Sequence, residues 1–372
     1  MSIQTTKPVS EKQIETEKAA PASGRLLSLD AFRGWTMFWI VGGTSLMFGL
    51  EALGHNPILD AVVYQLRHTE WQGLRFYDLI WPSFMLMTGM SLPFSYAKRS
   101  LTQSHRDIFL RVLLRAAVLF LLGSLRESVH LNRPYLVELS SALQPIGIAY
   151  LCAFLLVRKS WKVQAAVGGS ILLGYALLLA LVPPGSYAKD ANLVLSVDLA
   201  VLGRAHNEGW GTVLSTIPTI STTILGLLLG ELLRTARPAT AKAGIIGAIG
   251  LCGIALGWAM NPYVPVIMKL WTTSYGLASA GWSCLLFLFF YWVIDVHGYR
   301  KWAFPFVVIG ANALAIYMAG TLMPLHRIVG IFTGGIAAGM GSWGALFQAA
   351  AVLDVEWLIL YWMYKRKIFL VA

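Results

Sequence analysis

The sequence is poor in charge, cysteine and recognisable soluble-enzyme motifs. Asp, Glu, Lys and Arg make up only 13% of its 372 residues, against about 25% in an ordinary soluble domain. Cys152, Cys252 and Cys284 all lie inside apolar segments, which argues against a disulfide framework. The chain has no HxxxH or HxxE spacing, no GxSxG elbow and no P-loop. These absences exclude most soluble enzyme classes, and no metal site is predicted.

Long apolar stretches are what the sequence does contain, and 57% of its residues are hydrophobic. A bilayer core of roughly 30 Å requires about 20 apolar residues per spanning helix. A soluble protein of this length could not bury so many such stretches, so we predict an all-α, polytopic integral membrane protein. About ten spans are expected, and an eleventh would form only if the Gly-rich segment 325–345 also crosses. The ten are residues 31–53, 74–97, 108–125, 139–158, 162–182, 213–234, 243–260, 275–296, 304–323 and 346–364.

The distribution of basic residues predicts the orientation of these spans. Residues 1–24 are polar and are expected to form a disordered cytoplasmic tail, with residues 25–372 forming one transmembrane domain. With the N-terminus in the cytoplasm, 21 of the 29 Lys and Arg residues fall on the cytoplasmic side. Positive residues favour that side of a membrane. The net charge of +11 is thereby explained as a topology signal rather than as a nucleic-acid surface, and both termini are expected to be cytoplasmic.

Ionisable groups at membrane depth are costly and are therefore functional candidates. His68 lies in a predicted outer loop, and Asp78 follows ten residues later, about one turn into the next span. If the loop folds back, the carboxylate can fix the tautomer of the imidazole and raise its basicity, as a general base requires. The alternative is an interfacial His68 and an Asp78 that bonds a nearby loop group. The other polar groups near span ends or within spans are Asp30, Arg33, Glu208, Lys269, Asp295 and Asn312.

Four groups of residues follow one another along the chain. They are Arg25-Leu-Leu-Ser-Leu-Asp30-Ala-Phe-Arg33-Gly34; His68-x-x-Trp71-x-Gly73 with Asp78 and Pro82; Leu214-Ser-Thr-Ile-Pro218 with Gly226 and Gly230; and Lys269-Leu-Trp271-Thr-Thr-Ser274-Tyr275 with Asp295-Val296, Asn312-Ala-Leu and Tyr317. Their order and spacing resemble the heparan-alpha-glucosaminide N-acetyltransferase family and its bacterial relatives. The resemblance extends, in pieces, from Arg25 to Lys365.

The resemblance implies that an acetyl group moves from cytosolic acetyl-CoA to an amino sugar or related glycan on the far side of a bacterial inner membrane. The family's essential histidine matches His68, and a nearby family aspartate matches Asp78. Both become the expected catalytic residues. For the donor we expect contacts near the cytoplasmic side, at Asp30, Arg33, Lys98, Arg99 and Arg158.

Acceptor contacts are expected mainly on the outer side of the protein. Trp71 or Trp271 could stack on a sugar face, and Gln144 or Asn312 could steady an oxyanion. The complete set of expected substrate contacts is Trp71, Gln144, Glu208, Ser215, Lys269, Trp271, Ser274 and Asn312. Two departures from the family pattern affect this set. Relatives usually have Gln-Arg-Ile-Gly where this chain has Gln144-Pro145-Ile146-Gly147, and Asp-Pro-Glu-Gly where it has His206-Asn207-Glu208-Gly209, so the outer pocket is expected to recognise a different acceptor.

Two other classes of function stay open at the level of sequence. Ten spans with buried polar groups also suit a permease for a sugar or amino sugar, although the two halves show no internal repeat of hydropathy. A non-catalytic membrane scaffold would leave Asp78 and Asn312 without a purpose. Besides the bilayer and a glycan acceptor, a homodimer is an open partner, and neither the acceptor nor the choice between N- and O-acetylation follows from the sequence.

Overall fold

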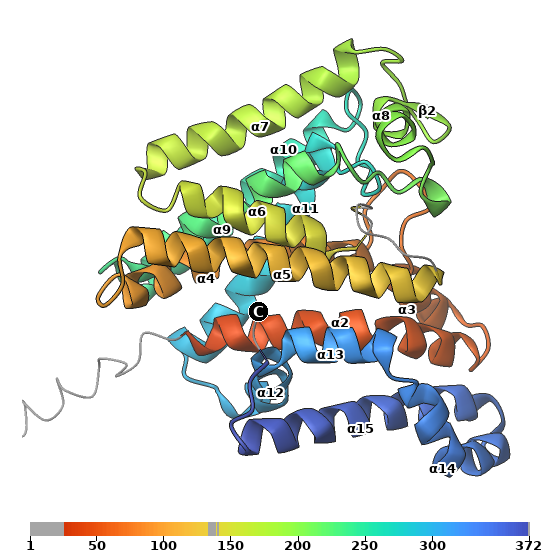
Figure 1. Ribbon diagram of the computed structural model, residues 1–372. Helices are drawn as coiled ribbons and strands as arrows, with labels where there is room; N and C mark the ends of the chain where they lie inside the picture. The colour runs from red at the N-terminus through yellow and green to blue at the C-terminus, as the bar shows by residue number, and fades with distance from the viewer. Residues whose placement is uncertain (1–25, 133–138, 140, 371–372) are drawn as a thin grey trace, which may run out of the picture.

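The computed structural model describes residues 26–132, 139 and 141–370, so the predicted tail at residues 1–24 lies outside the described residues. The fold is an all-α bundle whose long helices run roughly side by side (Figure 1). Its α-helices are α2 (Leu27–Glu51), α3 (Pro57–Leu66), α4 (Ile80–Arg99), α5 (His105–Leu131), α6 (Leu143–Leu155), α7 (Trp161–Leu181), α8 (Leu193–Leu202), α9 (Thr216–Arg234), α10 (Ala239–Met260), α11 (Thr273–Phe290), α12 (Phe304–Ala311), α13 (Ala313–Leu322), α14 (Leu325–Gly339) and α15 (Gly344–Lys365).

Six helical segments of the described chain are long and apolar enough to cross a membrane. They are α5, α7, α9, α10, the segment Thr273–Val296 that continues α11 through the π-helix η3 (Tyr291–Val296), and the segment Gly341–Lys365 that begins with η5 (Gly341–Trp343) and includes α15. The predicted count of ten is therefore not confirmed. Helices α2, α4 and α6 also occupy predicted spans. Most residues on one side of α2 and α4 are buried, and helices that face protein need less apolar surface than helices that face lipid.

The predicted span 304–323 is not one continuous helix. Helices α12 and α13 meet at Asn312 with a bend of 61°, and η4 (Lys301–Ala303) precedes α12. The Asn312 amide explains the break, because it donates to the Ile368 carbonyl at 3.0 Å and accepts from the Leu370 N–H at 2.9 Å. The C-terminal segment thus provides hydrogen-bond partners for the buried Asn312 side-chain amide. A straight helix would leave that amide in an apolar setting without them.

Small residues let the central helices pack closely. A Cβ at Gly89 of α4 would lie 1.9 Å from the Thr223 carbonyl oxygen of α9, and a Cβ at Gly226 of α9 would lie 2.1 Å from the Leu86 carbonyl oxygen of α4. A Cβ at Gly34 of α2 would similarly collide with the Phe306 carbonyl of α12, at 1.7 Å. Such contacts between backbones are typical of helix packing in membranes. They bring α4 directly against α9 and α2 directly against α12.

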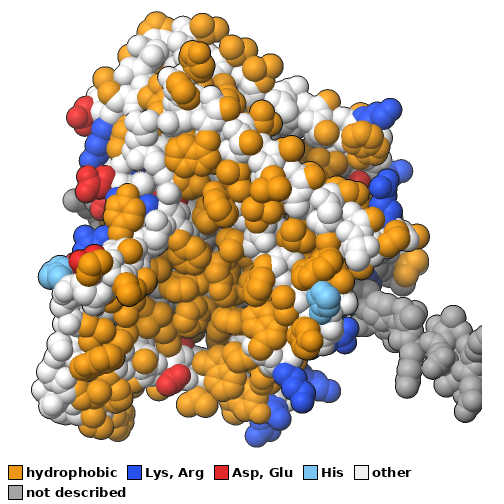
Figure 2. Space-filling model, turned by 180° about the vertical axis from the view of Figure 1, so that it is seen from behind, with side chains coloured by type: hydrophobic (Ala, Val, Ile, Leu, Met, Phe, Trp, Pro, Cys, Tyr) orange, Lys and Arg blue, Asp and Glu red, His pale blue; other side chains and the backbone are white. Residues whose placement is uncertain are grey.

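An apolar band crosses the surface between two charged sides (Figure 2). On the side that carries His68, the connections form structure that the sequence analysis did not predict: α3, α8, the 3-10 turns η1 (Phe76–Leu79) and η2 (Asn207–Gly209), and the strands β1 (Tyr187–Ala188) and β2 (Ala191–Asn192). The Gly-rich segment 325–345 contains α14, which packs against α15. Helix α14 is only 15 residues long and exposes Ile331 and Phe332, so the described structure supplies no eleventh full-length span.

Candidate functional site

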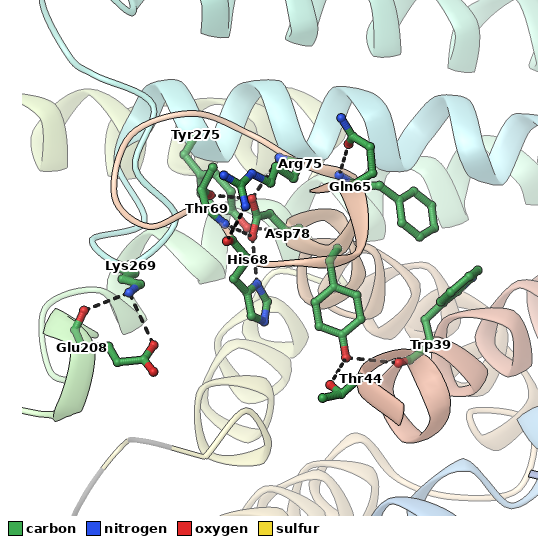
Figure 3. A network of polar contacts seen from close by, with 12 residues as sticks. Trp39, Thr44, Gln65, His68, Thr69, Arg75, Asp78, Glu208, Lys269 and Tyr275 are labelled. Atoms are coloured by element: carbon green, nitrogen blue, oxygen red, sulfur yellow. Dashed lines mark hydrogen bonds and ion pairs between the residues drawn. The ribbon is translucent and has the colours of Figure 1, made fainter. Parts of the chain in front are cut away.

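The carboxylate of Asp78 is the fixed point of the candidate site. It lies in η1, just before α4, and is completely buried. Its Oδ2 accepts a hydrogen bond from the Thr69 hydroxyl at 2.6 Å and from the Arg75 backbone N–H at 2.9 Å, while Oδ1 lies 2.8 Å from Nδ1 of His68. Tyr275 of α11 donates to the Asp78 carbonyl at 2.7 Å. The side chain of Asp78 is therefore held from several directions (Figure 3).

His68 is oriented by this carboxylate, as in the fold-back that was one of the two interpretations left open by the sequence. Because a buried carboxylate accepts from Nδ1, the neutral imidazole carries its proton there and leaves Nε2 as the basic nitrogen. The Arg75 guanidinium donates to the His68 carbonyl at 3.0 Å and so fixes the backbone of the loop. The second ring nitrogen points away from Asp78 (Figure 3), and the 40% exposed side chain lines a cavity. The arrangement suits a general base or a nucleophile.

Aromatic rings and an ion pair frame the imidazole. The His68 ring lies 4.8 Å from the Tyr77 ring and 5.5 Å from the Trp210 ring, between centroids. Lys269 is buried, donates to the Glu208 carbonyl at 2.9 Å and lies 3.5 Å from the Glu208 carboxylate, whose side chain is 73% exposed (Figure 3). The Lys269 ammonium is also 5.6 Å from the Trp210 ring centroid. Glu208 and Lys269 thus lie near His68, although they pair with each other.

One cavity of about 850 Å³ connects His68 with the opposite side of the bundle. Its wall on α4 follows one helical face through Ile80, Phe84, Thr88, Ser91 and Ser95. These residues extend over 15 positions of α4, or roughly 22 Å at 1.5 Å per residue. Further lining comes from α2, α5, α12, α13 and the segment around Trp210. The cavity is therefore long enough to connect groups at very different membrane depths.

Of the predicted donor contacts, only Arg33 lines this cavity. It pairs with the buried Asp30 at 3.1 Å, so Asp30 acts on the cavity through Arg33. Lys98, Arg99 and Arg158 are exposed at helix ends and do not line the cavity. The structure therefore brings the donor candidates together only in part.

Several predicted acceptor contacts have hydrogen-bonding partners elsewhere in the fold. Gln144 donates to Ser124, Ser215 donates to the Gly211 carbonyl, and Ser274 donates to the Pro265 carbonyl. Trp71 donates to the Tyr187 carbonyl, and Asn312 holds the C-terminal segment as described above. These five side chains do not line the cavity. Their observed contacts stabilise the walls around it.

Trp271 is also part of the wall rather than of the lining. It is 1% exposed and packs edge-on against Trp81, with centroids 4.9 Å apart. Its backbone has a left-handed φ of 48°, which is rare for a bulky residue and typical of constrained sites. Because Trp81 lines the cavity, Trp271 contacts the candidate site through that ring.

The sequence analysis missed Arg115, Arg126 and Glu127, which all line the cavity from α5. Arg115 lies within the predicted span 108–125 but was counted among the basic residues that mark the cytoplasmic side. Arg126 and Glu127 lie beyond that span because it was ended too early: in the structure α5 begins at His105 and ends at Leu131. A Ser104-x-x-Asp107 capping box was the signal that marked the true start.

The described residues form an all-α protein with several helices that can cross a membrane, and one long cavity within the fold is lined by both polar and apolar side chains. Among residues 26–132, 139 and 141–370, no group of three or more His, Cys, Asp and Glu side chains could hold a metal ion. No protein-family model matches the chain, and no curated protein matches it either.

Proposed function

We propose that this protein is a membrane-embedded acetyltransferase of the heparan-alpha-glucosaminide N-acetyltransferase type. It transfers an acetyl group from cytosolic acetyl-CoA to an amino sugar or related glycan on the outer side of a bacterial inner membrane. The observation that carries the proposal is the His68–Asp78 pair, 2.8 Å apart, at one end of a cavity that extends to Arg33 at the other. A site of this form lets a donor from one side meet an acceptor from the other.

Two routes are compatible with an unprotonated Nε2 on His68. In direct transfer, Nε2 removes the proton from the acceptor as its nitrogen or oxygen attacks the thioester carbonyl. The C–S bond then breaks, and the CoA thiolate leaves with the proton that His68 returns. In the two-step route, Nε2 itself attacks the thioester carbonyl, the C–S bond breaks and the CoA thiolate leaves, which gives an acetylated imidazolium. The acceptor then attacks this acetyl group, the bond from Nε2 to the acetyl carbon breaks, and the acceptor's proton passes to the thiolate. In both routes the buried Asp78 carboxylate stabilises the positive charge that develops on the ring.

The proposal is tested with purified protein in liposomes that contain acetyl-CoA only in the lumen. Glucosamine and related amino sugars are then added outside. Protein molecules whose Arg33 side faces the lumen should release CoA inside the liposomes and form acetylated sugar outside. Sugar that is acetylated only when it shares a compartment with acetyl-CoA would contradict transfer across the membrane. Activity that survives His68→Ala would remove the histidine from the mechanism.

A permease is the second candidate, because a cavity reaching both sides could also be a sugar pathway. The same liposomes distinguish the two functions when acetyl-CoA is omitted. A permease would accumulate or exchange labelled, unmodified sugar, whereas an acetyltransferase would retain sugar outside and convert it only when the thioester is supplied.

A further inference from the structure

Arg115 is a cationic residue near the middle of a membrane-spanning helix. Helix α5 has a mean hydropathy of 2.1 in its most apolar window, the highest among the candidate spans. Arg115 follows its first residue by ten positions and precedes its last by 16, which corresponds to roughly 15 Å and 24 Å along the axis. Its side chain lines the cavity. A guanidinium at this depth is costly, and such residues usually pair or mark an ion or substrate pathway.

No carboxylate neutralises Arg115 within the part of the chain that the structure describes. Its guanidinium contacts the Tyr150 ring, 4.8 Å from the centroid, and its Nε is buried without a hydrogen-bond acceptor. Other cations on the cavity have acidic partners: Arg126 lies 2.9 Å from Glu127, and Arg33 lies 3.1 Å from Asp30. The cavity therefore has an uncompensated positive charge at Arg115, which favours an anionic ligand.

The surroundings of Arg115 are polar on the facing helix as well. Helices α4 and α5 are joined by a connection of five residues, so their adjoining ends lie at a similar depth. Ser91 lies eight positions before the end of α4 and Ser95 four, or roughly 12 Å and 6 Å from that end. Both hydroxyls line the cavity together with Thr88. An anion at Arg115 would thus meet hydroxyl groups rather than a purely apolar wall.

We propose that Arg115 binds the diphosphate of the acetyl-CoA donor inside the membrane, an inference that rests on the proposed function. Ser91 lies 11 positions after Ile80, beside the His68 end of the cavity, a separation of roughly 17 Å along α4. The pantetheine arm has the length of about four extended residues, roughly 15 Å. The two lengths are similar, so a diphosphate at Arg115 would place the thioester near the His68 end of the cavity. The nucleotide is then drawn deeper than the helix-end residues Lys98, Arg99 and Arg158.

The test compares Arg115→Gln with Arg111→Gln, which removes an exposed arginine one turn earlier on the same helix. Two donors are used: acetyl-CoA, and S-acetylpantetheine, which lacks the diphosphate. We expect Arg115→Gln to raise KM for acetyl-CoA on the order of 10- to 100-fold, as for loss of a charged hydrogen bond. Activity with S-acetylpantetheine should stay within about twofold of the parent protein, which also shows that the variant is folded. Arg115→Lys should recover part of the affinity, and inorganic diphosphate should compete with acetyl-CoA in the parent but not in Arg115→Gln.

The outcomes separate this inference from the proposed function. If the parent protein turns over acetyl-CoA and Arg115→Gln has an unchanged KM, the diphosphate site is overturned and the proposed acetyltransferase activity is not. Equal losses with both donors would show that Arg115 supports the fold and would also overturn the site. Parent protein that neither binds CoA nor releases it from acetyl-CoA overturns the proposed function, and the inference with it.

Discussion

Two histidine–aspartate pairs lie on the same side of the molecule and have almost the same hydrogen bond. In one, His68 Nδ1 is 2.8 Å from Asp78; in the other, His55 Nδ1 is 3.0 Å from Asp60. Their surroundings differ completely. The Asp78 side chain is fully buried, whereas the His55 and Asp60 side chains are 83% and 53% exposed. A hydrogen-bonded His–Asp pair alone therefore does not make a site.

Three features distinguish the His68 pair. Its carboxylate has further donors in Thr69 and the Arg75 backbone, which restrict its position. Its imidazole opens into the long cavity, whereas His55 lines only a small surface pocket of about 210 Å³. Burial of the carboxylate in a low-dielectric region also strengthens its effect on the ring, while exposed charges are screened by water. Preorganisation and access therefore make His68, rather than His55, the candidate for a reactive histidine.

The largest effect is expected when the two histidines are removed one at a time. His68→Ala should lower kcat for acetyl transfer by about 10²- to 10⁴-fold, the usual contribution of a general base. His55→Ala should leave kcat within about twofold of the parent protein. Release of CoA measured under saturating donor and acceptor checks both values. Equal losses in the two variants would contradict the distinction between the pairs.

Replacement of the carboxylates is expected to have the next largest effect. Asp78→Asn keeps the shape of the side chain but removes the charge that stabilises an imidazolium, so we expect kcat to fall by about 10²-fold. Asp60→Asn should change it by less than about twofold. A rate that falls for Asp78→Asn without a change in its dependence on pH would indicate that the carboxylate acts on the fold of the loop rather than on the ring.

Much of this site follows from sequence because it depends on local connections. His68 and Asp78 are ten residues apart, and a polar loop beside an apolar span can fold back so that the two side chains meet. The supporting contacts are not local. Tyr275 reaches the Asp78 carbonyl across 197 positions, and Trp210 packs edge-on against His68 from a third segment. Nothing in the spacing of single residues predicts which distant helix supplies such a partner.

The same distinction applies to the fold. Apolar runs predicted helices throughout the bundle, since hydropathy is a property of neighbouring residues. The bend at Asn312 depends on the C-terminal segment at Ile368 and Leu370, 56 and 58 positions away, and could not be read from the run itself. Arg115 was missed for a simpler reason. It lies within the predicted span 108–125, yet it was counted as one of the basic residues that mark the cytoplasmic side of the membrane.

Loss of a side chain that only supports the His68–Asp78 pair should have a smaller effect than loss of either member of the pair. Tyr275→Phe removes only the hydroxyl that donates to the Asp78 carbonyl at 2.7 Å. A typical hydrogen bond contributes about 0.5–1.5 kcal/mol, so we expect kcat to fall by about 2- to 10-fold and the melting temperature to fall by a few degrees. Turnover and thermal unfolding in detergent measure the two effects. The control is Tyr64→Phe. Tyr64 lies on α3 near the exposed His55–Asp60 pair, and its substitution should change neither kcat nor the melting temperature.

The smallest effect is expected at the exposed pair. A double-mutant cycle with His55→Ala and Asp60→Asn should give a coupling of no more than about 0.2–1 kcal/mol in the free energy of unfolding, because water screens an exposed ion pair. In 1 M salt, where the Debye length is about 3 Å, the coupling should disappear. The corresponding cycle with His68→Ala and Asp78→Asn should retain its coupling in salt, since the carboxylate is shielded from solvent. Couplings of equal size and equal salt dependence would mean that burial does not separate the two pairs.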